Sequence, residues 1–232
     1  MRPLKFLLGL LLLPLAWVVV SATARLVAQL QPDELGAHPH SAAWLGGGFL
    51  LWLFLFATMP RPMRTYVLGH ELTHAFWALL MGARVSRLRV SAHGGSVTVS
   101  KTNWIITLAP YFFPFYSVLL LALVLVLGFF LDLRPYEPLV LALLGLTYAF
   151  HVTFTISMLT HRQPDIQEHG RLFSYVVIVL LNTLALGGWI VAAAPPSLHD
   201  YARLLEADGR RTAHHLHHAG LRSIDWIRAH VK

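Results

Sequence analysis

Long apolar segments separated by short polar breaks dominate the chain. Most of these segments are about as long as a helix that crosses a bilayer; they lie at residues 6–30, 42–59, 65–81, 104–131, 138–160 and 172–194. The breaks contain proline, glycine and charged residues, which end helices and favour a water interface. The pattern predicts an all-α polytopic membrane protein with about six transmembrane helices.

The first apolar segment has two interpretations. Two basic residues precede the apolar run 6–20, and small residues follow at 21–24, as in a cleaved signal peptide. However, the run is long for a signal peptide, and apolar residues continue to Leu30. We therefore expect residues 1–30 to stay in the protein as its first span.

One short region departs from the helical pattern. Residues 84–101 alternate apolar and polar positions on either side of Gly94-Gly95, which is typical of a β-hairpin. Because an open sheet edge cannot face lipid, this small hairpin must lie at the membrane interface or inside the protein. Its unpaired edge, with Val97 and Val99, is a candidate clamp that would hold an extended peptide by main-chain hydrogen bonds.

The last residues form a different kind of segment. Residues 197–232 mix both charges, and Leu221, Ile224, Ile227 and Val231 recur at helical spacing. This spacing predicts an amphipathic helix lying on the membrane surface. The chain therefore divides into a polytopic membrane domain, residues 1–196, and a basic amphipathic tail, residues 197–232.

Composition supports the membrane assignment and narrows the chemistry. Of the 232 residues, 56% are hydrophobic and only 12% are charged, which is unlike a soluble domain. The absence of cysteine excludes disulfides, thiolate zinc sites and a cysteine nucleophile. The net charge of +7 suits contact with the headgroups of a lipid bilayer, and we expect no nucleic-acid partner because no such motif is present.

The candidate chemistry lies in the third apolar segment, which contains His70-Glu-Leu-Thr-His74. On a helix, two histidines four residues apart share one face, and both can reach one Zn²⁺ ion. Glu71 can then act as the general base toward a water molecule. A packed helix with two hydrogen-bonded histidines is the alternative, but three titratable groups among apolar residues are costly to place in lipid without a use.

A zinc site of this kind needs a third protein ligand and leaves the fourth position open. The downstream candidates are His151, His161, Asp165, Glu168 and His169. We favour Asp165, because it follows Pro164 at the junction of two apolar segments, where a helix start would hold its carboxylate. The same carboxylate could also cap the helix. His151, an ionisable residue within a span, could support a ligand, stabilise the transition state or bond a neighbouring helix.

Residues 65–190 resemble the site-2-protease family of intramembrane zinc metalloproteases, peptidase family M50 and its M50B-like branch. The resemblance rests on the order of the features: the His-Glu-Leu-Thr-His helix, the Arg/Val hairpin, a proline-containing span and an aspartate at a helix junction. It implies one Zn²⁺ per chain held by His70, His74 and Asp165, with Glu71 activating water.

Two elements of the family pattern differ in this chain. Gln163-Pro-Asp-Ile166 lacks the glycine that follows the family's aspartate, and residues 109–113 lack the asparagine of the family's Gly-Pro-x-x-Asn element. The resemblance implies hydrolysis of a peptide bond in or near the transmembrane segment of a protein substrate. It also implies an integral multi-pass protein, which we expect in the plasma (inner) membrane.

Two other functions fit parts of the sequence. A non-catalytic membrane scaffold could keep the zinc fold, although Glu71 would then have no use. A membrane di-iron oxygenase could use His70-x-x-x-His74 together with His214-His-Leu-His217-His218, but such sites need further histidine boxes that the sequence lacks.

Overall fold

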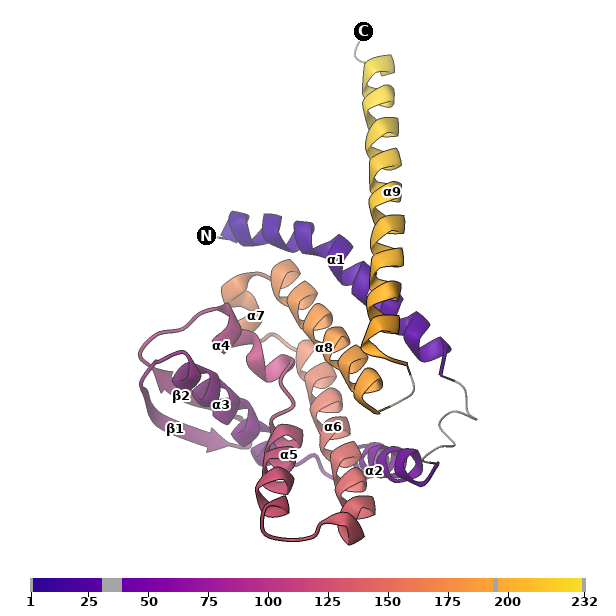
Figure 1. Cartoon of the computed structure of the whole chain (residues 1–232). Coiled ribbons are helices and arrows are strands. Elements are labelled where there is room, and N and C mark those ends of the chain that lie inside the picture. Colours follow the sequence, from indigo (N-terminus) through magenta and orange to yellow (C-terminus); the bar gives the residue numbers. More distant parts are fainter. Residues whose placement is uncertain (1, 31–38, 194–195, 231–232) are drawn as a thin grey trace. The chain divides into compact units, whose positions relative to one another are not determined.

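The computed structural model describes residues 2–30, 39–193 and 196–230. Most of the chain is helical, and one antiparallel two-stranded hairpin follows the motif helix, as predicted (Figure 1). In chain order the elements are α1 (Arg2–Ala28), α2 (Pro39–Thr58), α3 (Met63–Leu80), β1 (Val85–Ser91), β2 (Gly94–Val99), α4 (Trp104–Leu108), the 3-10 helix η2 (Ala109–Tyr111), α5 (Phe115–Gly128), the 3-10 helix η3 (Arg134–Tyr136), α6 (Glu137–Leu159), α7 (Pro164–His169), α8 (Arg171–Ala193) and α9 (Leu198–His230).

The chain forms two compact units. Its division into a membrane domain and a tail stays a prediction. One unit is continuous, from Ala37 to Arg171, and contains the motif helix α3 and the hairpin. The other combines Met1–Gly36 with Leu172–Lys232 and therefore contains α1, most of α8 and α9.

Four helices in the described ranges are long and apolar enough to cross a membrane: Pro3–Ala28, Ser41–Thr58, Arg134–Leu159 and Arg171–Val191. A fifth candidate is the pair Trp104–Tyr111 and Phe115–Gly128, which is bent by 86°. This bend lies at Pro110 and Pro114, because proline interrupts the backbone hydrogen bonds of a helix. Helix α3 is not among the candidates, since the motif places charged and polar groups on it.

Close contact between α2 and α6 organises the continuous unit. A Cβ atom added to Gly48 would lie 1.8 Å from the Ala142 carbonyl oxygen, and one added to Gly145 would lie 1.9 Å from the Leu45 carbonyl oxygen. Only glycine permits the two backbones to approach this closely, as at small-residue crossings of membrane helices.

An aromatic cluster continues this contact toward α3. Trp52 packs with Phe150 and Phe154 of α6, and its indole N–H donates to Thr153 Oγ1 at 2.8 Å. The ring of Tyr66 on α3 stacks on Phe154 with a centroid separation of 4.6 Å. The α2–α6 pair thereby supports the first half of the motif helix.

The hairpin packs along α3 with β1 and β2 in antiparallel register (Figure 1). Val85 pairs with Val99 and Leu88 pairs with Val97, with an irregularity between Ser86 and Leu88. Arg87 lies at this irregularity with a φ of 41°, a left-handed conformation typical of bulges rather than of regular strands. Most β1 residues are exposed, whereas Val97 and Val99 of β2 are partly covered.

The second unit is built on apolar contacts of α1 with α8 and α9. Ala16 and Val19 pack with Val176 and Leu180 of α8. Further along α1, buried Ala22 and Leu26 pack with Tyr201 and Leu204 of α9.

Polar contacts join the same helices. Thr23 and Tyr201 share a buried hydrogen bond of 2.8 Å between their hydroxyls, and Arg25 pairs with Asp208 at 2.6 Å. The packing of α1 agrees with a retained first span, which stays a prediction. The beginning of α9 therefore belongs to a packed core, while the helix after residue 210 is largely exposed. Val231 of the predicted apolar stripe lies outside the described residues.

Candidate metal centre

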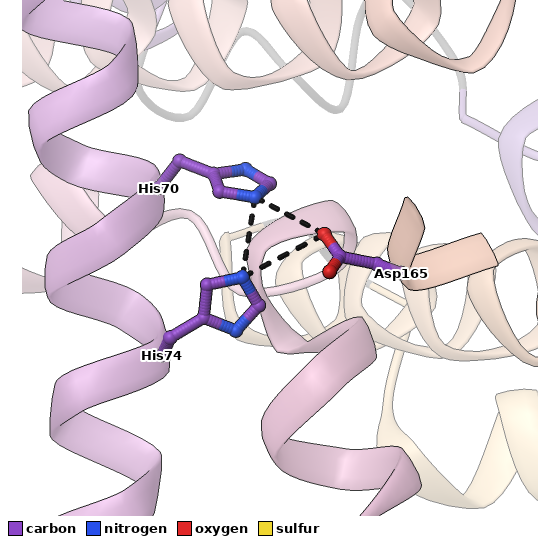
Figure 2. Close-up of side chains that lie close together, drawn as sticks. All are labelled: His70, His74 and Asp165. Atoms are coloured by element: carbon purple, nitrogen blue, oxygen red, sulfur yellow. Dashed lines mark hydrogen bonds and ion pairs between the residues drawn. The ribbon is translucent and has the colours of Figure 1, made fainter. Parts of the chain in front are cut away.

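The two motif histidines lie one turn apart on α3 and direct their rings to the same side (Figure 2). Their Nε2 atoms are 3.2 Å apart, and the rings meet edge to face with centroids 4.8 Å apart. The spacing of four residues is therefore sufficient to bring two imidazole nitrogens to one point, as the sequence predicted.

Asp165, in the first turn of α7, brings a carboxylate to these histidines (Figure 2). Its Oδ2 lies 3.3 Å from His70 Nε2 and 3.6 Å from His74 Nε2. The three ligand atoms all lie within 4.8 Å of one another, and these residues form the only group of three or more potential ligands found in the described part of the chain.

Burial and hydrogen bonding act in opposite directions on Asp165. Burial raises the pKa of its carboxyl, but the hydrogen bonds from His70 and His74 outweigh this and hold the pKa well below its usual range. The group is therefore a carboxylate at neutral pH, the form in which aspartate binds metals.

Neighbouring groups fix the orientation of both histidines. His74 Nδ1 lies 2.7 Å from the Ile106 carbonyl oxygen in α4. Because a carbonyl only accepts, Nδ1 carries the proton, and loss of the Nε2 proton, which metal binding requires, leaves the Nε2 lone pair facing the centre. His70 Nδ1 lies 3.2 Å from the Tyr66 hydroxyl. Partners of this kind orient metal-binding histidines in known sites.

Tyr111, at the end of η2, orients the third candidate ligand, Asp165. Its side chain is fully buried, and its hydroxyl donates to Asp165 Oδ2 at 3.0 Å. The same ring meets His70 edge to face with a centroid distance of 5.4 Å. Tyr111 thus touches residues of both α3 and α7, which are far apart in sequence.

Glu71 lies next to the three candidate ligands, and all four residues line one cavity. The cavity has a volume of about 620 Å³, and α3, the hairpin, α4 and α7 contribute to its walls. Glu71 itself is only 7% exposed. A buried carboxylate beside a cavity is the arrangement that a general base requires.

The hairpin covers Glu71 closely at Gly95. A Cβ atom at this position would lie 2.7 Å from Glu71 Cγ and 2.6 Å from Val67 Cγ1. The glycine therefore permits β2 to lie directly against α3. Val97 and Val99, the predicted clamp residues, line the cavity together with Gly95.

The other predicted candidates lie outside the three-residue group. His151 borders a small pocket of about 30 Å³ beside His70 and Tyr66, on the side of α3 that faces α6. His161 is exposed and bonds locally to Ser157, while His169 is buried and close to Glu168.

Three residues of the centre escaped the sequence analysis: Tyr66, Ile106 and Tyr111. Tyr66 lies four residues before His70, so helical spacing alone could have indicated it. The contributions of Ile106 and Tyr111 arise from tertiary contacts that carry no local signal.

The fold and centre together define an integral membrane protein with a candidate metal site of two imidazoles and a carboxylate. Comparison with protein families gives the same class: the Peptidase M50B-like family model matches residues 41–162, more than half of the chain. The chain belongs to this family of site-2-protease-type membrane metallopeptidases, which are zinc-dependent. Asp165 lies just beyond the matched residues. Neither the curated proteins nor the solved structures compared with the chain gave a match.

Proposed function

We propose that the protein is an intramembrane zinc metalloprotease that hydrolyses a peptide bond in or near the transmembrane segment of a protein substrate, in regulated intramembrane proteolysis. The observation that carries this proposal is the convergence of His70, His74 and Asp165 beside Glu71 in one cavity. We place this reaction in the plasma (inner) membrane, at an active centre formed wholly by the unit Ala37–Arg171.

The donor set suits zinc. Two neutral imidazole nitrogens and one carboxylate oxygen make three protein ligands. Catalytic zinc sites use this number and leave the fourth position for water or substrate. Tyr66, Ile106 and Tyr111 provide the supporting shell. Zinc bound there would polarise a substrate carbonyl and lower the pKa of water.

We assign the proton transfers to Glu71. As general base, its carboxylate takes a proton from the attacking water, and the new C–O bond forms at the scissile carbonyl. The protonated Glu71 then gives this proton to the amine nitrogen as the C–N bond breaks. A scaffold with a structural metal alone would have no use for this residue.

The peptide must be unwound before this reaction, because a helical peptide bond is shielded by its own backbone hydrogen bonds. We propose that β2 holds the unwound substrate strand by main-chain hydrogen bonds along Val97 and Val99. Support comes from their position on the cavity wall beside Glu71. Val97→Pro should then raise KM far more than Val97→Ala, and unimpaired cleavage by the proline variant would contradict the clamp.

Metal analysis of the detergent-purified protein tests the ligand set. We expect one zinc per chain in the wild type, loss of zinc in His70→Ala and Asp165→Ala, and retention in Glu71→Gln. Glu168→Ala is the matched carboxylate control, because Glu168 lines the cavity outside the ligand group. Zinc retained in Asp165→Ala would show that the third ligand is another residue. Iron in place of zinc would favour the alternative function of a membrane di-iron oxygenase.

Cleavage of a set of single-span reporter proteins in liposomes tests the activity separately. The zinc-loaded wild type should cut at least one reporter, and Glu71→Gln should reduce the rate by about 10³-fold, a typical effect of losing a general base. A protein that binds zinc but cuts no reporter would favour the scaffold function.

A further inference from the structure

Helix α9 carries a second pair of histidines with the spacing of the motif. His214 and His218 are four residues apart, and their Nε2 atoms lie 3.0 Å from each other. The ring centroids are 4.3 Å apart with an interplanar angle of 58°. In His70 and His74 the corresponding Nε2 distance is 3.2 Å. Both pairs therefore present two imidazole nitrogens to a single point.

The neighbouring histidines of α9 do not share this point. The rings of His215 and His217 lie about 6 Å from their nearest histidine neighbours, at 6.1 Å from His214 and 5.9 Å from His218 respectively. They occupy other directions around the helix, since positions one residue apart diverge by about 100°. The segment 214–218 therefore contains one convergent pair rather than a uniform cluster.

The surroundings of the pair are open, and no third metal ligand joins the pair among the residues that the structure describes. His214 and His218 are exposed, and the metal-ligand group found among the described residues does not include them. The nearest charged residues along the helix are basic: Arg210, Arg211 and Arg222. Arg210 is paired with Glu206, and Arg211 lies 3.8 Å from Asp208, which reduces their repulsion of a cation.

We propose that His214 and His218 form a second metal site, an exposed two-imidazole chelate for a divalent transition-metal ion. Imidazole pairs suit Zn²⁺, Ni²⁺ and Cu²⁺, whereas Mg²⁺ and Ca²⁺ require oxygen ligands. Because both rings already point at the same place, little side-chain conformational entropy is lost when the ion binds. Water completes the coordination, and the ion exchanges freely with solvent. This site does not depend on the proposed proteolytic function.

Affinity should separate this site from the centre at α3. Among the described residues, the α9 pair has neither a carboxylate ligand nor partners like Tyr66 and Ile106 that orient its rings. The loss of the orienting partners alone typically costs about 10- to 100-fold in affinity. Among the candidate ions, Cu²⁺ should bind more tightly than Ni²⁺ or Zn²⁺.

Nickel titration of the full-length protein in detergent tests the pair against a matched control. His214→Ala/His218→Ala should lose one Ni²⁺ equivalent relative to the wild type. His215→Ala/His217→Ala removes the same number of histidines from the same turn of α9 and should keep that equivalent. Equal loss of bound Ni²⁺ in both double variants would reveal a diffuse histidine surface and overturn the proposal. Unchanged Ni²⁺ binding in both variants would overturn it as well.

Electron paramagnetic resonance with Cu²⁺ gives an independent reading. Two populations of bound Cu²⁺ are expected, one at the α3 centre and a more weakly bound one at the α9 pair. The more weakly bound population should show hyperfine coupling to two imidazole nitrogens. This signal should vanish in His214→Ala/His218→Ala and persist in His215→Ala/His217→Ala. A one-nitrogen signal in the wild type would contradict a two-imidazole site.

Discussion

The same histidine spacing occurs on two helices, and the two pairs have very different surroundings. On α3, His70 and His74 meet the Asp165 carboxylate, the Ile106 carbonyl and the Tyr66 hydroxyl. On α9, His214 and His218 are exposed to solvent, and the interaction found at their Nε2 atoms is the one with each other. The spacing thus makes a pair, but a catalytic centre needs tertiary contacts that supply a further ligand, fixed tautomers and a base.

The two histidine pairs also differ in the contacts that hold their helices, α3 and α9, in place. Helix α3 is fixed from both sides, by the α2–α6 pair through Tyr66 and by the hairpin at Gly95. The part of α9 that carries the histidines lies beyond its packed beginning, so its pair depends on helix formation alone. Changes in the core should therefore affect the α3 centre and leave the α9 pair intact.

The largest effect should follow from Gly48→Ala at the α2–α6 contact. The added methyl group would meet the Ala142 backbone, whose carbonyl oxygen lies 1.8 Å from the Cβ position. Overpacking of this kind costs about 1–3 kcal/mol, and the backbone cannot move aside as a side chain could. We expect a lower Tm in detergent and weaker zinc binding, because the displaced α6 carries Phe154, on which Tyr66 stacks.

Gly47→Ala is the matched control on the same helix. A Cβ atom at Gly47 meets no atom within 4 Å outside the nearby backbone of its own helix, so this variant should keep the wild-type Tm and zinc content. Nickel binding at His214 and His218 should be unchanged in both variants. Equal Tm values for Gly48→Ala and Gly47→Ala would show that the α2–α6 contact does not support the centre.

A smaller effect should follow from Tyr111→Phe, which removes only the hydroxyl that donates to Asp165. The Asp165 carboxylate would keep its two histidine neighbours but lose a fixed orientation. We expect zinc affinity to fall by about 10-fold, the lower end of the effect seen when a group that orients a metal ligand is removed. Competition with a zinc chelator measures this change.

Tyr136→Phe is the control, because Tyr136 is 58% exposed and lies outside the residues of the centre. It should bind zinc as tightly as the wild type. The α9 pair has no counterpart of Tyr111, so its nickel affinity should not change in either variant. A Tyr111→Phe protein with unaltered zinc affinity would mean that the Tyr111 hydroxyl is not needed to orient Asp165.

Local patterns predicted the parts of the molecule that depend on nearby residues. The motif helix was expected at 65–81 and runs from Met63 to Leu80. The hairpin was expected around Gly94-Gly95; it is present, but its turn lies at residues 92–93, and both glycines belong to β2. The proline-containing segment 104–131 corresponds to the pair of helices that is bent by 86°. Asp165 could be selected because it follows a proline between two apolar segments, and it lies beside both histidines.

Contacts between distant segments were not predictable in this way. Tyr111 and Ile106 are apolar or aromatic residues in an apolar stretch, and their roles depend on how α4 and η2 meet α3 and α7. Arg25 and Asp208 lie at opposite ends of the chain, and their ion pair follows from the packing of α1 on α9. Among the described residues four helices, or five with the bent pair, are long and apolar enough to span a membrane, and α3 is not one of them. The count of about six spans stays a prediction.

The smallest expected effect concerns the start of α9, where Ser197 and Asp200 cap the helix reciprocally. The Ser197 hydroxyl and N–H both donate to Asp200 Oδ2, and the Asp200 N–H donates to Ser197 Oγ at 3.2 Å. These bonds, followed by the one from Arg203, hold the pKa of Asp200 well below its usual range. Ser197→Ala should lower hydrogen-exchange protection in the first turn of α9 by about fivefold, as for a lost N-cap.

The same cap predicts that the stability of the first turn of α9 depends on pH. Because the pKa of Asp200 is lower in the folded than in the unfolded chain, its stabilising effect is complete above the unfolded pKa of about 3.9 and is lost as the pH falls further. The protection lost in Ser197→Ala should therefore be largest at neutral pH and shrink in acid. Ser223→Ala, which removes a hydroxyl bonded only to the Ala219 carbonyl of the same helix, is the control and should show no such pH dependence. If the two variants behave alike, the reciprocal cap does not hold the start of α9, and packing of Tyr201 and Leu204 against α1 must suffice.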